Sequence, residues 1–138
     1  DLGDGIMVRP VKLNHPNGAV GYRIETPDGV VAISGDTLVC DEVADLAAGA
    51  DVLVYEAMRF SEIRKVPEHR QYILDYHADT LLIGAQAEEI GVPLLVLTHL
   101  IPAPTCDADE QAFVDDVRSG GYTGEVVVAS DLTSVTLP

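Results

Sequence analysis

The chain has 138 residues, of which 47% are hydrophobic, and this length and composition fit a single globular domain over residues 1–138. The formal charge of −15, with only eight basic residues, argues against a surface made to hold nucleic acid, because phosphate binding needs clustered Lys and Arg. No apolar run is long enough to span a bilayer and the start does not resemble a signal peptide, so we expect no membrane contact and a cytoplasmic location.

The first third of the chain predicts three strands. Residues 6–13 are strand-like, and Pro10 places this strand at an edge or a bulge because proline cannot donate to a ladder. Residues 19–25 alternate as a half-buried strand. The turn at 26–29 contains Pro and Gly and joins this strand to the next one, at 30–34, as a hairpin.

The rest of the chain predicts alternating helices and strands. Acidic residues open some of the helices, Asp79 is placed to cap one of them, and glycines end them. The segment 60–76 mixes charges with a proline and predicts irregular or briefly helical structure. The order therefore predicts an α/β fold, with helices at 41–48, 80–90 and 107–119 and strands at 51–56, 94–98, 125–129 and 132–137.

Polar residues stand where three apolar strands end. Asp36, Glu56 and His99 each come at or just after the carboxyl end of a strand whose apolar run indicates burial on both faces. Open α/β sheets place their chemistry at that edge. We therefore expect these three side chains to point toward one rim of the sheet.

Half of the basic residues fall in one stretch after the Glu56 strand. Arg59, Arg64, Lys65 and Arg70 are candidates to line a pocket for an anionic substrate, and the plainer alternative is a solvated helix face. Cys40 and Cys106 have no Cys-x-x-Cys spacing, so we expect free thiols.

Five short motifs occur in an order that resembles a known family. They are His15, Ser34-Gly-Asp-Thr37, Tyr55-Glu-Ala57, Tyr76-His77 and Leu97-Thr-His99. Together they resemble the second half of metallo-β-lactamase-fold hydrolases, in particular the ribonuclease Z-like branch. The resemblance covers nearly the whole chain and implies an αββα sandwich, of which this chain supplies the second half.

The resemblance implies a role for each residue. His15 would bind one Zn²⁺ and His99 a second, with Asp36 as the bridge, and imidazole and carboxylate are ligands that Zn²⁺ accepts. His77 would stabilise charge or protonate the leaving oxygen, and Glu56 would orient His77. Taken singly, each of these residues has a plainer interpretation, as a surface or capping histidine, a turn aspartate, or a salt-bridged strand end.

Two departures from the family pattern limit the prediction. The His-x-His-x-Asp-His motif is absent, so each of two metals would have only two protein ligands from this chain, whereas zinc sites ordinarily have three or four. Residues 101–104, Ile-Pro-Ala-Pro, replace an aromatic or basic run, and no long insertion for gripping transfer RNA lies between Tyr22 and Asp36. Together with the acidic charge, these features disfavour transfer RNA and favour a small phosphodiester, sulfate-ester or lactone substrate.

The predicted partners follow from the expectation that this chain forms only the second half of an αββα sandwich. An open apolar sheet face would not stay bare in water, so we expect a homo-oligomer such as a dimer, or association with a missing N-terminal half. The alternative function is a non-catalytic assembly or binding module that uses the same face. Bound zinc would favour the hydrolase, and its absence would favour the module.

Overall fold

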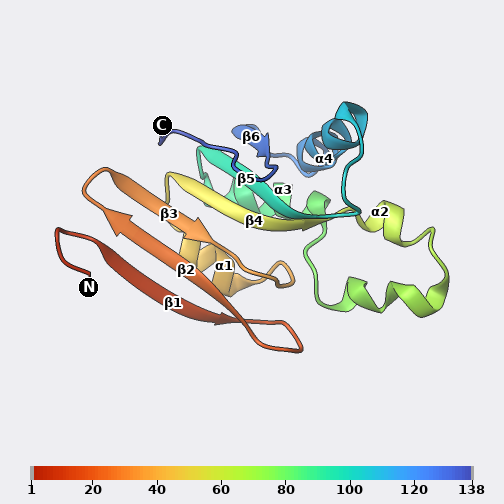
Figure 1. The fold of residues 1–138 in the computed structure, drawn as a ribbon, viewed down its shortest axis with the longest axis horizontal. Coiled ribbons are helices and arrows are strands. Elements are labelled where there is room, and N and C mark those ends of the chain that lie inside the picture. The colour runs from red at the N-terminus through yellow and green to blue at the C-terminus, as the bar shows by residue number, and fades with distance from the viewer. Residues whose placement is uncertain (1, 138) are drawn as a thin grey trace.

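The structure is a computed structural model that describes residues 2–137. Its centre is a six-stranded sheet in which the strands lie in sequence order, each beside the next along the chain (Figure 1). The strands are β1 (Met7–Leu13), β2 (Ala19–Thr26), β3 (Gly29–Ile33), β4 (Val52–Met58), β5 (Leu94–Ile101) and β6 (Glu125–Val128).

The sheet changes from antiparallel to parallel pairing at β3. β1, β2 and β3 form antiparallel hairpins, and the turn at Thr26–Gly29 closes the second one as predicted. β1 is an edge strand, which accommodates Pro10 as expected. From β3 onward the neighbours pair in parallel, because each connection crosses back through a helix.

The crossover helices lie on one face of the sheet, where they bury the main core (Figure 1). Asp79 caps α3 by accepting a hydrogen bond from the Leu81 N–H, and Gly91 ends the same helix with a φ of 73°. The three helices of this layer are α1 (Asp41–Ala47), α3 (Thr80–Ile90) and α4 (Asp107–Ser119). Their apolar sides pack on inward-facing residues such as Leu53, Tyr55 and Leu95.

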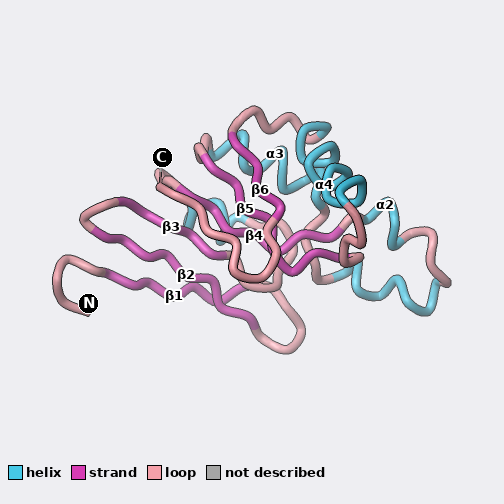
Figure 2. Tube along the Cα trace, turned by 45° about the horizontal axis from the view of Figure 1, so that its top comes forward, coloured by secondary structure: helices cyan, strands magenta, loops and turns pink. Residues whose placement is uncertain are grey.

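The opposite face of the sheet carries a second, smaller cluster, formed by Val52, Leu94 and Val96. The expected strand at 132–137 is wrong: after β6 the chain turns at Ser130–Thr133 and runs in an extended, unpaired form over this face (Figure 2). Leu137 packs against the small cluster. Partial burial of this side chain on the sheet face, rather than pairing as a further strand at the edge, accounts for the difference. Elsewhere on the face Val20 and Tyr22 remain 42% and 43% exposed.

The segment between β4 and α3 projects away from the sheet (Figure 1). It contains α2 (Phe60–Ile63) and the 3₁₀ helix η1 (Glu68–Asp75), as the expectation of brief helical structure indicated. None of the η1 residues is buried. Among residues 2–137, no helix combines the length and the apolar character that a bilayer crossing requires.

Candidate functional site

Five polar residues gather where β3, β4 and β5 end. Asp36 follows β3, Glu56 lies in β4 and His99 in β5, and loops bring His15 and His77 to the same rim. The His77 ring stacks on that of His99 with centroids 5.4 Å apart, and the His15 ring lies 5.6 Å from His77. The sheet therefore brings together all five residues that the sequence singled out.

The end of β5 is bent in a way that sets the direction of His99. The pairing with β4 runs regularly to Glu56 and Thr98 and then shifts register, so that Met58 pairs with Ile101. His99 lies at this irregularity with a φ of +47°. A left-handed conformation is uncommon outside glycine, and bulges of this kind re-aim side chains near functional sites.

Asp36 and His99 face each other at the open side of the rim. His99 Nε2 lies 3.8 Å from Asp36 Oδ2, and the two side chains are 47% and 40% exposed. The distance is too long for a hydrogen bond and suits two groups that point at a shared third atom. Solvent reaches both donors, so an ion or a substrate can approach them.

Glu56 lies behind this pair and is almost fully buried, with 1% of its surface exposed. Its Oε1 accepts three hydrogen bonds, from the Thr37 N–H at 3.0 Å, the Ala78 N–H at 3.2 Å and the His77 Nδ1 at 2.9 Å. One carboxylate oxygen thus holds the loop after β3 and the loop that carries His77. The expected hydrogen bond between Glu56 and His77 is present.

These hydrogen bonds assign the tautomer of His77. Because Oε1 already accepts from two backbone N–H groups, the His77 Nδ1 must carry the hydrogen, which leaves Nε2 free to act at the rim. Burial lowers the pKa of His77 and so favours the neutral ring. Burial also raises the pKa of Glu56 to about 8, while the Thr37 and Ala78 N–H groups act in the opposite direction.

A metal ion fits the donor set at this rim. One potential ligand atom from each of Glu56, His77 and His99 lies within 4.8 Å of the other two. Oε1 of Glu56 is saturated by three donors, however, and its Oε2 is buried without a hydrogen-bond partner. Glu56 is therefore better suited to orient His77, and the exposed pair of Asp36 and His99 is better suited to bind the ion.

Several groups of the site could not be found from the sequence. Backbone N–H groups of Thr37 and Ala78 carry no side-chain signal. The Ser34 hydroxyl accepts a hydrogen bond from the Glu56 N–H, and Tyr76 packs edge-on against His15 with ring centroids 5.0 Å apart. Ser34 and Thr37 do flank Asp36 in the Ser-Gly-Asp-Thr motif, and Tyr76 precedes His77, so the motifs pointed to them indirectly.

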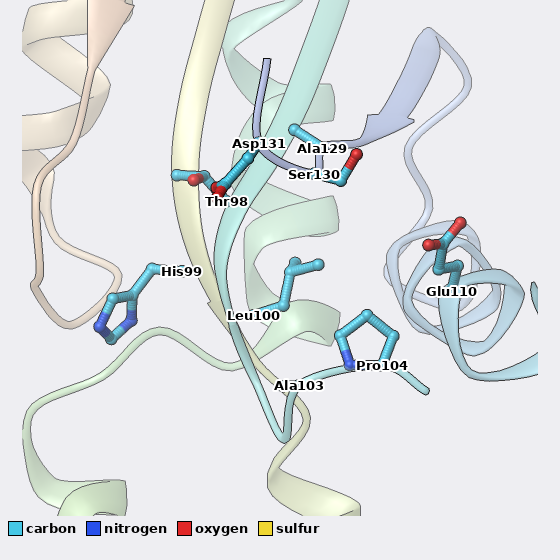
Figure 3. Close-up of a pocket in the computed structure, with 9 residues that line it drawn as sticks. All are labelled: Thr98, His99, Leu100, Ala103, Pro104, Glu110, Ala129, Ser130 and Asp131. Carbon is cyan, nitrogen blue, oxygen red and sulfur yellow. The ribbon is translucent and has the colours of Figure 1, made fainter. Parts of the chain in front are cut away.

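A cavity of about 590 Å³ opens beside His99. Figure 3 shows His99 at its edge, with the imidazole turned away from Glu110 and Pro104 on the far side. The wall is built by the end of β5, the start of α4 and the turn after β6. Glu110 and Asp131 make its lining acidic.

We compared the sequence and the fold of the chain with those of known proteins. No family model matches the chain. A putative ribonuclease Z of Mycobacterium tuberculosis strain CDC 1551 is 34% identical over 135 residues, which are 96% of this chain and 59% of that protein. A ribonuclease Z of strain H37Ra is also 34% identical, with 49% of its length covered. The chain thus spans about half the length of the curated relatives it matches.

Solved structures show the same fold. The metallo-β-lactamase fold protein YhfI of Bacillus subtilis matches with a TM-score of 0.69 and 22% identity, over 91% of this chain and 47% of that one. The short form of human tRNase Z matches with a TM-score of 0.63 and 19% identity, over 99% of this chain and 44% of that one.

The fold is that of about half of a metallo-β-lactamase-fold protein. Together with the sequence similarity, this confirms the predicted fold and the resemblance drawn from the motifs. In sequence the chain is similar to ribonuclease Z proteins over about half of their length.

Proposed function

We propose that this chain is the second half of a metal-dependent hydrolase that cleaves a phosphodiester or a related ester. The observation that carries the proposal is that an exposed pair of potential metal ligands lies in front of a buried pair of hydrogen-bonded residues at one rim. The exposed Asp36 and His99 lie 3.8 Å apart, and the buried Glu56–His77 pair lies directly behind them. An open ligand pair beside an oriented imidazole is what metal-assisted hydrolysis requires.

His15, Asp36 and His99 would hold zinc in this proposal. When bound, zinc polarises the scissile group and makes a water molecule nucleophilic near neutral pH. Divided between two zinc ions, these three residues leave each ion with fewer than the three or four protein ligands that zinc ordinarily takes. The remaining ligands would come from outside this chain, which fits its match to about half of each relative.

His77 would handle the proton. With Nδ1–H donating to Glu56, the neutral ring presents a bare Nε2 to the rim, where it can accept the proton that the attacking water loses and then pass it to the leaving oxygen. Glu56 would keep the ring in that orientation and stabilise the imidazolium form while it lasts. The Thr37 and Ala78 N–H groups would in turn fix Glu56.

The face of the sheet opposite the helices is the place for the rest of the protein. Val20 and Tyr22 are exposed there beside the small cluster that the C-terminal segment covers. An apolar sheet face of this kind stacks on a second sheet in a sandwich. We propose that the missing first half packs here, and a second copy of the chain is the alternative occupant.

The same face supports the second candidate function, a non-catalytic assembly module. Metal analysis of the protein assembled with its first half separates the two candidates. The hydrolase predicts about two zinc ions per assembled site, and a marked loss in Asp36→Ala but not in Asp28→Ala, a change at an exposed turn far from the rim. Assembly without bound zinc would favour the module.

A further inference from the structure

The chain between Glu56 and His77 does not itself fix the position of one residue relative to the other. Residues 59–76 leave the body of the protein, and none of the η1 residues is buried (Figure 1). The two ends of this segment are joined at its base, where the Met58 N–H donates to the Ala78 carbonyl oxygen at 2.9 Å and Glu56 accepts from His77 and Ala78. The geometry of the pair therefore depends on noncovalent links at this base.

A further link at the base comes from Asp116 on α4. Its Oδ2 accepts a hydrogen bond from Arg59 Nε at 2.7 Å and another from the Thr80 hydroxyl at 3.2 Å. Arg59 lies three residues after Glu56, and Thr80 lies three residues after His77. One carboxylate oxygen of a third element thus holds the segment that follows each member of the pair.

Burial and packing make this link rigid. Thr80 is fully buried, and the side chains of Arg59 and Asp116 are only 17% and 27% exposed. The residue after Asp116, Val117, lies so close to α3 that a Cβ at Gly84 would collide with its carbonyl oxygen. Since α4 cannot slide along α3 without losing this contact, the Asp116 carboxylate is held in a fixed place. Hydrogen bonds to a charged group are also stronger than those between neutral groups.

We propose that Asp116 is a positioning residue that keeps the Glu56–His77 pair in the geometry that proton transfer requires. The inference rests on the proposed function, because it adds a remote support to the residue that handles the proton there. Reacting groups must stay aligned, and a displacement of about 1 Å can slow a reaction by about a hundredfold. Asp116 itself contacts neither the proposed metal ligands nor the reacting atoms.

Removal of the carboxylate releases both ends of the link. In Asp116→Ala, the Arg59 guanidinium would turn toward Glu62, whose carboxylate already lies 3.8 Å away. The Thr80 hydroxyl would keep only its contact with the Met58 carbonyl oxygen, at 3.3 Å. The segments after Glu56 and before α3 would then lose their common acceptor, so the pair would become more mobile.

Turnover of bis(p-nitrophenyl) phosphate by the zinc-loaded protein assembled with its first half gives the first measurement. Asp116→Ala should lower kcat by about tenfold, the lower end of the loss expected when a supporting partner of a functional histidine is removed. KM and zinc content should stay unchanged, because the lost interaction orients the proton carrier rather than binding substrate or metal. Asp116→Asn keeps an oxygen acceptor and should retain most of the activity. Asp115→Ala removes the same charge from an exposed neighbour that bonds Gln111, and should keep wild-type kcat.

Exchange of the His77 Nδ1–H with solvent reports the geometry of the pair without any turnover. This proton is protected while it is donated to the buried Glu56. NMR of the assembled protein, with isotope-labelled histidine in this chain alone, should show exchange at least about tenfold faster in Asp116→Ala than in the wild type. Tyr122→Phe loses a buried hydrogen bond to the Val92 carbonyl oxygen, at the opposite end of β5 from the rim, and should leave this exchange unchanged.

A second variant covers the case in which Asp116→Ala does not fold. Thr80→Val removes one of the two donors to Asp116 and keeps the shape of the side chain. It should lower kcat and accelerate the His77 Nδ1–H exchange in the same direction as Asp116→Ala, by a smaller factor. Wild-type behaviour of Thr80→Val in both measurements would then overturn the inference.

The outcomes separate this inference from the proposed function. Wild-type kcat or wild-type exchange in Asp116→Ala overturns the inference, and so does equally fast exchange in Tyr122→Phe, which would indicate general loosening. Asp116→Asn as impaired as Asp116→Ala would show that the charge matters rather than the shared acceptor, and would overturn the link as described. Absence of ester turnover in the wild type counts against the proposed function instead, while the exchange measurement still decides whether Asp116 holds the Glu56–His77 pair.

Discussion

Replacing Glu56 tests the internal support of the site in the chain itself. In Glu56→Ala, the Thr37 N–H, the Ala78 N–H and the His77 Nδ1–H all lose their shared acceptor. Thr37 and Ala78 are fully buried, so water does not readily replace the carboxylate at either N–H group.

The expected loss of stability follows from those three donors. A buried donor without a partner costs about 1–3 kcal/mol, and relief of the buried carboxylate offsets part of the total. We therefore expect Glu56→Ala to lower the free energy of unfolding by at least about 2 kcal/mol, which in a chain of this size lowers Tm by at least about 6 °C. Glu56→Gln keeps an oxygen acceptor, so it should cost less.

Urea unfolding monitored by circular dichroism provides the measurement, with Glu62→Ala as the control. Glu62 pairs with Lys65 at the surface, and such pairs contribute at most about 1 kcal/mol. Glu56→Ala within about 1 kcal/mol of the wild type, or Glu56→Gln as unstable as Glu56→Ala, would show that the three hydrogen bonds do not hold the loops as described.

Two further predictions concern other parts of the molecule. Burial raises the pKa of the Cys40 thiol whereas Cys106 is exposed, so iodoacetamide at mildly alkaline pH should modify Cys106 first; equal rates in peptide mass spectrometry would refute this. A Cβ at Gly84 in α3 would collide with the Val117 carbonyl oxygen in α4, so Gly84→Ala should destabilise the protein by about 1–3 kcal/mol. A gain of about 1 kcal/mol, the usual result of Gly→Ala inside a helix, would contradict the close approach of the two helices.

The regular elements could be predicted because their signals are local. Apolar runs, turn residues and glycine stops define the strands and helices, and Pro10 predicted an edge position or a bulge, of which β1 takes the edge position. The segment 132–137 shows why such signals have limits. Its apolar residues suit a strand, but the choice between pairing at an edge and packing Leu137 onto a sheet face depends on residues distant in the sequence.

For the candidate site, the sequence likewise predicted the residues but not their geometry. The residue types at the strand ends, with the family resemblance, identified Asp36, Glu56, His77, His99 and His15. The geometry that distinguishes their contributions depends on pairing between strands. The register shift between β4 and β5 turns His99, and the backbone N–H groups that surround Glu56 come from two separate loops. Neither feature leaves a pattern in the sequence.

Turnover and metal content of His77→Ala, measured together, test the proposed mechanism most directly. The protein assembled with its first half and loaded with zinc would be assayed with bis(p-nitrophenyl) phosphate. We expect turnover to fall by at least about a hundredfold, because general acid assistance is lost, while the zinc content stays at the wild-type value. Unchanged turnover would contradict the role of His77 as proton donor, and loss of zinc would show that His77 is a ligand.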